Sequence, residues 1–242
     1  WKNDSSARKA EGLPDSVDLV HGRLDGPAIA REGGVDFLCD LREGQKTGWF
    51  YDQRDNRDRL APWVKGARVL DVFSYLGGWG LRAAELGAAE VECVDVSARA
   101  VEGIRANISH NGLADRATAT AADAFDFLRD ARHARRRWDV VVLDPPAFVK
   151  RRKDFKEGAL AYRRLNEAGL QVLEPGGILV TCSCSHHMPR ADLVAGLQAA
   201  ARAQDRFVQL LEPMTQSADH PVHPAIPETE YLKGVLARVL PA

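Results

Sequence analysis

The feature that constrains this chain most is an alternation, from residue 68 onward, of short apolar segments with longer amphipathic ones. Such an alternation is typical of a parallel β-sheet whose strands are joined by crossover helices. The fourth apolar segment is continuously apolar at residues 140–143, as expected for a strand covered on both faces. The segments predict strands at residues 68–73, 90–96, 117–121, 138–144 and 177–183.

The end of the chain predicts how the sheet closes. A helix is expected at residues 191–203, followed by strands at 206–211 and 231–240 with a loop rich in proline and histidine between them. These two strands could form a hairpin at the sheet edge, and a seven-stranded sheet of this kind favours a methyltransferase over a six-stranded dinucleotide dehydrogenase. Residues 1–60 differ, because their short apolar pieces are broken by glycines, and they predict a small β-rich N-terminal region.

Composition narrows the class of protein. The 242 residues are 45% hydrophobic and 28% charged, which is ordinary for a globular protein with a full core. The net charge of -1 argues against a uniformly basic nucleic-acid binder, so any affinity for RNA would come from local patches. The start of the chain does not resemble a signal peptide and no apolar run could span a membrane, so we expect a cytoplasmic protein. The four cysteines form no CxxC pair and are expected to be free thiols.

A glycine-rich turn follows the first predicted strand, at residues 71–80, which read Asp-Val-Phe-Ser-Tyr-Leu-Gly-Gly-Trp-Gly. Glycines there would let the backbone approach a ligand, and the N-terminus of the next helix would offer unpaired N-H groups. The order Gly-Gly-x-Gly is not the dinucleotide-binding fingerprint. A tight strand-to-helix connection without a ligand would look the same.

Three carboxylates are predicted at the carboxyl ends of neighbouring strands, where open α/β sheets bind ligands: Asp71, Asp95 and Asp123. Asp95 could accept hydrogen bonds from ribose hydroxyls, or it could simply lead into the helix that begins at Ser97. Asp123 could hold an adenine amino group, or it could be only the N-cap of the next helix.

The fourth strand is predicted to end in Asp144-Pro-Pro-Ala-Phe148. Two prolines make a rigid, extended loop without amide donors, which would aim the Asp144 carboxylate into the cleft and leave Phe148 near for stacking on a base. In amino-group methyltransferases a comparable loop binds the target base. The alternative to a binding loop is that the two prolines only end the strand.

The fifth strand is predicted to end in a segment with two cysteines, Cys182 and Cys184. Residues two apart share a face, and Cys184 is nearer the expected cleft. Pyrimidine C5 becomes nucleophilic only when a thiolate adds to C6, so Cys184 is the candidate nucleophile. Inert packing is the usual role of a buried cysteine, and a zinc site with His186 and His187 would lack the usual ligand spacing. Either histidine could instead favour the thiolate.

Basic residues cluster at 132–137 and at 150–153. The second cluster begins with Lys150, just after the Asp144 loop, where it could hold RNA phosphates. A solvated charge run is the more common explanation for the first cluster.

Taken together, the Asp144 loop and the Ser183-Cys184-Ser185 triplet make the chain resemble the RNA cytosine-C5 methyltransferases of the large-subunit rRNA type. Residues 44–54, Gly-Gln-Lys-Thr-Gly-Trp-Phe-Tyr-Asp-Gln-Arg, are similar to a segment of that family, as are residues 73–78, 219–221 and 231–234. The resemblance covers about residues 33–240. Related guanine-directed enzymes share the Lys-Thr-Gly and Asp-Pro-Pro segments but lack the cysteine.

The resemblance implies an α/β fold, a Rossmann-like seven-stranded class I methyltransferase sheet, over residues 61–242. It also implies S-adenosylmethionine as the cofactor, RNA as the partner and, in many members, a homodimer. Gln53 and Arg54 match a segment near the cofactor pocket, and Cys184 matches the nucleophile. The positions that match the pocket are Asp71, Ser74, Tyr75, Gly77, Asp95, Asp123 and Asp144. Members usually carry an N-terminal RNA-binding domain for which these residues leave no room, so we expect either a preceding domain or another route to RNA.

The sequence therefore predicts transfer of a methyl group to C5 of an RNA cytosine through a covalent bond between Cys184 and C6, with Asp144 on the polar edge of the base. Two rivals stay open. One is an enzyme of the same fold that acts on an exocyclic nitrogen of guanine or on a small molecule. The other is an RNA-binding or assembly factor without catalysis.

Overall fold

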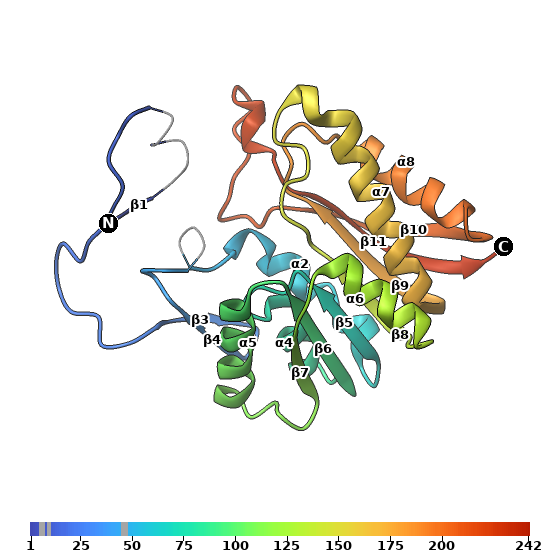
Figure 1. Cartoon of the computed structure of the whole chain (residues 1–242), viewed down its shortest axis with the longest axis horizontal. Coiled ribbons are helices and arrows are strands. Elements are labelled where there is room, and N and C mark those ends of the chain that lie inside the picture. The colour runs from blue at the N-terminus through green and yellow to red at the C-terminus, as the bar shows by residue number, and fades with distance from the viewer. Residues whose placement is uncertain (5–7, 9–10, 45–47) are drawn as a thin grey trace.

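The computed structural model describes residues 1–4, 8, 11–44 and 48–242 (Figure 1). Gln45, Lys46 and Thr47 of the segment at 44–54 lie outside the described residues. The strands of the main sheet are β5 (Arg68–Val72), β6 (Glu90–Asp95), β7 (Ala117–Ala121), β8 (Trp138–Leu143), β9 (Leu173–Ser183), β10 (Arg206–Thr215) and β11 (Lys233–Pro241). The helices that pack on it are α4 (Gly78–Glu85), α5 (Ala98–His110), α6 (Ala124–His133), α7 (Phe155–Val172) and α8 (Arg190–Arg202).

The sheet has seven strands in the order β10-β11-β9-β8-β5-β6-β7. Strands β5 to β9 pair in parallel, and β11 is antiparallel to both β9 and β10. The predicted edge hairpin is therefore confirmed, and so is the Rossmann-like class I methyltransferase sheet. Two strands are longer than expected: β9 begins at Leu173, and β10 continues past an irregularity between Leu210 and Glu212 to Thr215.

Helices cover both faces of the sheet, as the continuously apolar strand β8 requires. Residues of α4 and α5 pack on one face, and residues of α6, α7 and α8 pack on the other. The two helix starts predicted from capping residues are confirmed. Ser97 accepts a hydrogen bond from the Ala100 amide at the start of α5, and Asp123 accepts from Phe125 and Asp126 at the start of α6.

The N-terminal region is β-rich only in its first part. It contains β1 (Lys2–Asn3), β2 (Ser16–Val17) and the hairpin of β3 (Ala28–Glu32) with β4 (Val35–Cys39). The following stretch is helical instead, because it forms η1 (Tyr51–Gln53), α2 (Arg54–Asp58) and α3 (Ala61–Val64). The expectation of a β-rich region up to residue 60 is thus wrong for its last part, where η1 and α2 form. The apolar side chains that join the core here are those of Leu60 and of Val64 in α3.

A buried ion pair joins the strand part of this region to its helical part. The guanidinium of Arg57 lies 2.6 Å from the Glu32 carboxylate, and both side chains are at most 3% exposed. Trp49 donates a hydrogen bond to the same carboxylate. The guanidinium carbon of Arg57 lies over the Trp49 ring, 4.6 Å from the ring centre. Such a pair is costly to break from one side, so β3 is held firmly against α2. The turn η1, which directly precedes α2, carries Gln53 to Asp144 at the end of β8.

Two shorter helical turns, η2 (Arg152–Asp154) and η3 (Pro227–Thr229), lie in the connections before α7 and β11. Within the part of the chain that the structure describes, no helix is both long enough and apolar enough to cross a bilayer.

Candidate active site

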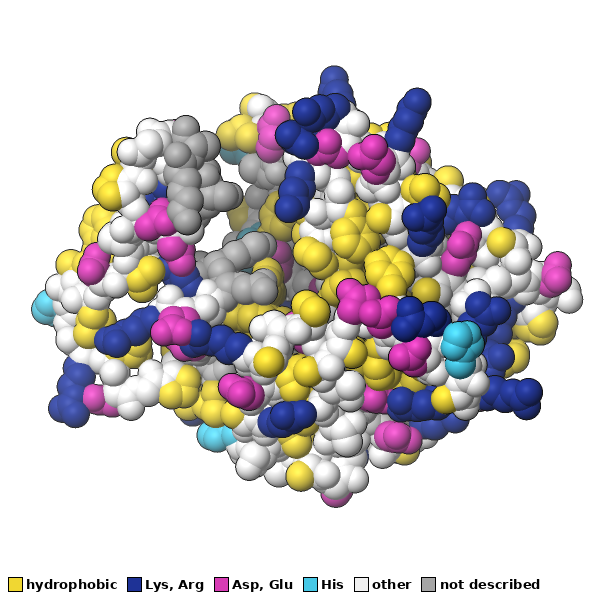
Figure 2. Space-filling view, in the orientation of Figure 1, with side chains coloured by type: hydrophobic (Ala, Val, Ile, Leu, Met, Phe, Trp, Pro, Cys, Tyr) yellow, Lys and Arg dark blue, Asp and Glu magenta, His cyan; other side chains and the backbone are white. Residues whose placement is uncertain are grey.

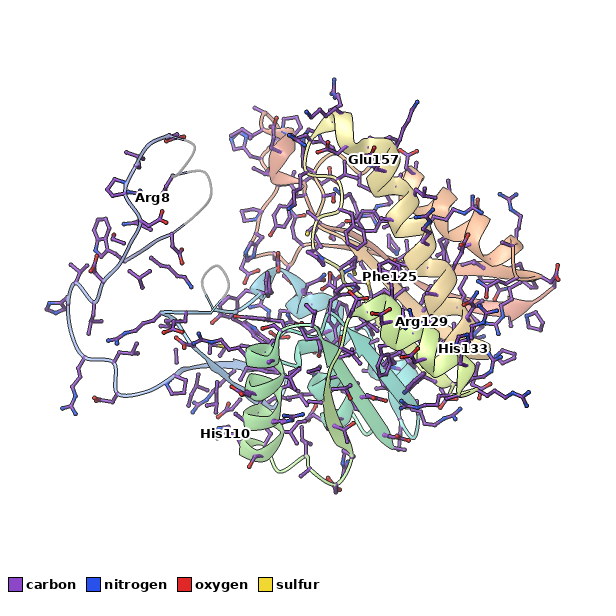
Figure 3. All side chains as sticks on the ribbon, viewed as in Figure 1. Arg8, His110, Phe125, Arg129, His133 and Glu157 are labelled. Atoms are coloured by element: carbon purple, nitrogen blue, oxygen red, sulfur yellow. The ribbon has the colours of Figure 1, made fainter. Side chains whose placement is uncertain are left out.

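The predicted site residues gather at one edge of the sheet, where β5 to β9 end. Parallel strands bring their carboxyl ends to the same edge, so Asp95, Asp123 and Asp144 meet there although they are far apart in sequence. Figure 3 labels Phe125, at the start of α6, which marks this edge beside Asp123.

The glycine-rich turn after β5 is conformationally unusual. Phe73 and Tyr75 adopt φ of 65° and 54°, and Gly77 adopts 86°. Left-handed backbone costs a non-glycine residue on the order of 1 kcal/mol or more, and such strain persists only where the surroundings enforce it. At Gly77 a side chain would also meet Leu81 at 2.9 Å. The turn is thus held in one shape, directly at the N-terminus of α4.

Asp71 lies beneath this turn and has no exposed surface. One oxygen of its carboxylate accepts hydrogen bonds from the Ser74 hydroxyl and from the Gly80 amide at 2.9 Å, while the other is buried without a partner among the described residues. Burial raises the pKa of Asp71 to about 7. Because Asp71 reaches Ser74 and Gly80 rather than solvent, it supports the turn from inside.

Asp95 is partly exposed at the end of β6. One oxygen accepts from the Tyr75 amide and the other from the Ser97 amide, each at 2.9 Å. The carboxylate is therefore fixed in direction by the backbone of both the glycine-rich turn and the start of α5. Each oxygen keeps further acceptor capacity for the hydroxyl groups of a ligand. Tyr75 itself points toward the N-terminal region, since its hydroxyl donates to the Gly48 carbonyl at 3.2 Å.

Asp123 is exposed, and one of its oxygens is used by the cap of α6. The helix-cap interpretation is thus confirmed. It does not exclude a ligand, because the second oxygen accepts no hydrogen bond from the described residues.

Asp144 is held by side chains that come from distant parts of the sequence. Its Oδ2 accepts from Gln53 Nε2 at 2.9 Å and from Trp79 Nε1 at 3.1 Å. Gln53 is in turn fixed by Asn56, whose amide donates to the Gln53 oxygen at 2.7 Å. The residue keeps some exposed surface, but the protein atoms around its carboxylate desolvate it and raise its pKa.

Cys184 is the one cysteine of the four with part of its surface exposed, and all four lie in the described part of the chain. Cys182 is fully buried, and burial raises the pKa of its thiol well above the usual value. A side chain on Gly234 would meet the Cys182 sulfur at 2.9 Å, so this thiol is packed tightly against β11. Cys182 is therefore a packing residue, and Cys184 is the thiol with surface that a reactant could reach.

The serines on either side of Cys184 are tied to one tyrosine of α7. The Tyr162 hydroxyl accepts from Ser183 Oγ at 2.9 Å and lies 2.9 Å from Ser185 Oγ. Ser185 also accepts from the Val149 amide at 3.1 Å, just after Phe148. These buried contacts join the end of β9 to the loop that follows Asp144. The peptide that carries Cys184 thus has a fixed position relative to that loop.

The other predicted residues lie around this edge with different exposure. Phe148 is half-buried, with its ring 4.8 Å from Tyr162 and 6.5 Å from Phe73. Lys150 is exposed beyond the loop. Arg54 forms an ion pair with Asp55 and lies 3.6 Å from Asp219, so the segments at 44–54 and 219–221 are brought together.

Several supporting residues escaped the sequence analysis. Trp79 donates to Asp144, Tyr162 binds the two serines, and Tyr231 donates to Asp52 at 2.8 Å. Lys233 is buried and donates to the Ser185 carbonyl at 2.6 Å, directly after Cys184. Trp79 stands within the Gly-Gly-Trp-Gly turn, and Tyr231 and Lys233 stand within the segment at residues 231–234, so these three had a signal in the sequence. Tyr162 gives none, because a tyrosine on a helix is usually a core residue.

Comparison of the sequence with known proteins finds methyltransferases both among protein families and among individual relatives. A family described as S-adenosylmethionine-dependent methyltransferase matches residues 15–236. The chain is 43% identical to ribosomal RNA large subunit methyltransferase I of Shewanella amazonensis over 98% of its length, and 44% identical to that of Shewanella frigidimarina. It covers 61% and 60% of these relatives, so it spans about three fifths of their length.

Solved structures resemble the fold over most of the chain. One described as a methyltransferase from Streptococcus mutans superposes with a TM-score of 0.81 at 23% identity, covering 93% of this chain and 58% of its own. Another, solved with S-adenosylhomocysteine bound, has a TM-score of 0.79 at 25% identity and covers 91% of this chain and 58% of its own.

Proposed function

The chain belongs to the S-adenosylmethionine-dependent methyltransferase family, and from this premise we propose that it methylates C5 of a cytosine in RNA, with large-subunit rRNA as the substrate. The observation that carries the proposal is Cys184, a partly exposed thiol at the end of β9 beside the Asp144 loop. A nitrogen-directed methyltransferase needs no such thiol, whereas C5 chemistry requires one. The names of the relatives support rRNA as the substrate.

The residues of the site fit the cofactor. Its ribose hydroxyls are donors, and Asp95 is a partly exposed acceptor held in position by two backbone amides. Its adenine amino group is also a donor, which suits the free oxygen of Asp123. Its sulfonium and ammonium groups are cations, and the carboxylates at this edge offset positive charge. When bound, S-adenosylmethionine supplies an electrophilic methyl group.

The reaction proceeds through the chain's own thiol. The Cys184 thiolate adds to C6 of the cytosine, which makes C5 nucleophilic, and C5 then takes the methyl group. A general base removes the C5 proton, the C5–C6 double bond forms again, and the thiolate leaves. Asp144 accepts a hydrogen bond from the amino edge of the base, and the half-buried Phe148 ring supports its face.

Orientation is the contribution of the surrounding residues. Tyr162 and the two serines fix the peptide of Cys184, while Gln53 and Trp79 fix the Asp144 carboxylate. Two groups that are held before the substrate arrives lose little entropy in the reaction.

The test is methyl transfer from labelled S-adenosylmethionine to unmodified rRNA, followed by nucleoside analysis, for the wild type and Cys184→Ala. We expect label in 5-methylcytidine with the wild type and none with the variant, while both bind the cofactor equally. Cys182→Ala is the matched control, because that thiol is buried, and it should retain transfer. Label in a guanosine derivative that does not depend on Cys184 would replace the proposal by a nitrogen-directed reaction.

A further inference from the structure

A second feature lies away from the active site, in the basic cluster at residues 132–137. Five arginines line a hollow of about 260 Å³: Arg132, Arg135, Arg136, Arg137 and Arg206. The rest of its lining is two glutamines and a leucine, and no carboxylate of the described residues lines it. We call this feature the arginine hollow. Figure 2 shows Lys and Arg side chains gathered on the right of the molecule, where Figure 3 labels His133 at the end of α6.

The arginine hollow lies at the edge of the sheet opposite the active site. Arg137 directly precedes β8, and Arg206 is the first residue of β10. Asp144 follows the other end of β8, which has six residues. At about 3.3 Å per residue, the two ends of β8 are roughly 20 Å apart. The hollow is therefore separate from the catalytic edge but within reach of one structured RNA.

Backbone carbonyls at the end of α7 gather the guanidinium groups. Arg137 Nη1 donates to the carbonyls of Gln171 and Leu173, and Arg206 Nη1 donates to those of Leu170 and Leu173. The C-terminus of a helix attracts cations, which explains how several positive charges can lie together here. Each of these two guanidinium groups uses only one nitrogen in these bonds, so its other N–H donors are available.

Four of these five arginines have no carboxylate partner among the described residues. Arg136 forms an ion pair with Glu92, but among the described residues the other four arginines have no carboxylate within ion-pair distance. Arg206 is half-buried, and burial together with the nearby Arg137 lowers its pKa. By contrast, Arg31, Arg116 and Arg163 each pair with an acidic neighbour. A chain with a net charge of -1 thus places four arginines without an ion pair to a described residue in one hollow.

We propose that the arginine hollow binds phosphate groups of the RNA backbone and forms a second contact of the substrate, at the sheet edge opposite Cys184. The ligand class follows from the donors, since guanidinium groups match the geometry of phosphate oxygens. A polyanion that contacts both edges gains from the second site without any change at the first. The proposal rests on RNA being the substrate, as in the proposed function.

The experiment measures binding of a fluorescein-labelled rRNA fragment by anisotropy over a range of salt concentrations. The test variant is Arg132→Gln/Arg135→Gln/Arg137→Gln, in which Arg206 still donates to the Leu173 carbonyl that Arg137 releases. The control is Arg31→Gln/Arg116→Gln/Arg163→Gln, which removes the same charge from paired arginines. Thermal unfolding verifies both folds. The single variant Arg135→Glu changes an exposed side chain that makes no hydrogen bond or ion pair to the described residues.

We expect the test variant to lose about 10- to 100-fold in affinity near 0.1 M salt, with a salt slope lower by roughly two to three, because each phosphate contact contributes about 0.7 to 0.9 to that slope. The control should change affinity by less than about threefold. An equal loss in both triple variants, or no loss in the test variant and Arg135→Glu, would overturn the proposal, as would a wild type that does not bind RNA.

The same preparations separate this proposal from the proposed function. If the wild type makes no 5-methylcytidine while the test variant alone loses RNA affinity, the cytosine reaction fails and the arginine hollow stands. If 5-methylcytidine forms through Cys184 while affinity is unchanged in the test variant, the hollow fails and the reaction stands.

Discussion

The two halves of the active edge are held in place in different ways. One half, at the ends of β5, β6 and β7, is the proposed site of the methyl donor, and we call it the donor half. Its carboxylates accept hydrogen bonds from backbone amides, as Asp95 does from Tyr75 and Ser97. The other half, at the ends of β8 and β9, is the proposed site of the base that accepts the methyl group, and we call it the acceptor half. Here side chains are fixed by hydrogen bonds from other side chains, as Asp144 is by Gln53 and Trp79. The donor half therefore depends on the local course of the backbone, and the acceptor half depends on packing between distant segments.

The difference suits the ligands that the proposed function assigns to the two halves. Because the cofactor always has the same shape, a rigid backbone can bind it with little dependence on the side chains nearby. A base that enters from an RNA needs particular side-chain atoms in fixed positions relative to the thiol. Single substitutions should therefore affect cofactor affinity in one half and the rate of transfer in the other.

The largest expected effect concerns Asp71, the buried carboxyl of the donor half. Its pKa is about 7 in the folded protein against an ordinary value of 3.8, so the folded state keeps a proton that the unfolded chain has released between these pH values. The free energy of unfolding should fall as pH rises through this window, by up to about 4 kcal/mol. Urea unfolding at several pH values measures it, and Asp71→Asn should remove most of the fall. A pH dependence that is identical in the variant would contradict the assignment.

The second prediction concerns a substitution that should weaken cofactor binding in the donor half and leave the acceptor half unchanged. Asp95→Ala should raise the dissociation constant of S-adenosylmethionine about 100-fold, because two hydrogen bonds to a charged acceptor are lost. Calorimetric titration measures it, with Glu102→Ala, an exposed acid on α5, as the control. The rate at which iodoacetamide alkylates Cys184 should not change. Cofactor affinity within about threefold of the wild type would rule out the ribose role.

The third prediction concerns a substitution that should slow methyl transfer in the acceptor half and leave cofactor binding unchanged. Tyr162→Phe removes the hydroxyl shared by Ser183 and Ser185, so Cys184 should lose its fixed position and turnover should fall roughly tenfold. The affinity for S-adenosylmethionine should stay within about twofold. Steady-state kinetics with saturating cofactor measure the change. A lower unfolding temperature with unchanged turnover would show that Tyr162 only stabilises the fold.

The smallest effect is expected at Asp123, where the helix cap and the cofactor role can be separated. Asp123→Asn keeps a good N-cap, so the unfolding free energy should change by less than about 0.5 kcal/mol. Loss of the charge should weaken cofactor binding only about threefold. Thermal unfolding and calorimetry measure the two effects. Unaltered cofactor affinity would leave Asp123 as a helix cap only.

The same contrast explains what the sequence could predict. The seven strands of the main sheet and the capping roles of Ser97 and Asp123 depend on residues close in sequence, and these were predicted, although β9 and β10 are longer than expected. Gln53 and Trp79 lie 91 and 65 residues before Asp144, and no local pattern links them. The helical turns at residues 51–64 were missed because they are short and stabilised by tertiary contacts such as the Arg57–Glu32 pair. Asp71 matched a cofactor position, but only the structure shows it under the turn.

The most direct test of the central claim is covalent trapping with RNA that carries 5-fluorocytosine at the target position. Fluorine at C5 cannot leave as a proton does, so the bond between Cys184 and C6 should persist after methyl transfer. We predict a protein–RNA adduct on denaturing gels that requires S-adenosylmethionine, persists in Cys182→Ala and is absent from Cys184→Ala. An adduct that survives in Cys184→Ala, or 5-methylcytidine formed by that variant on ordinary RNA, would contradict the role of Cys184 as the nucleophile.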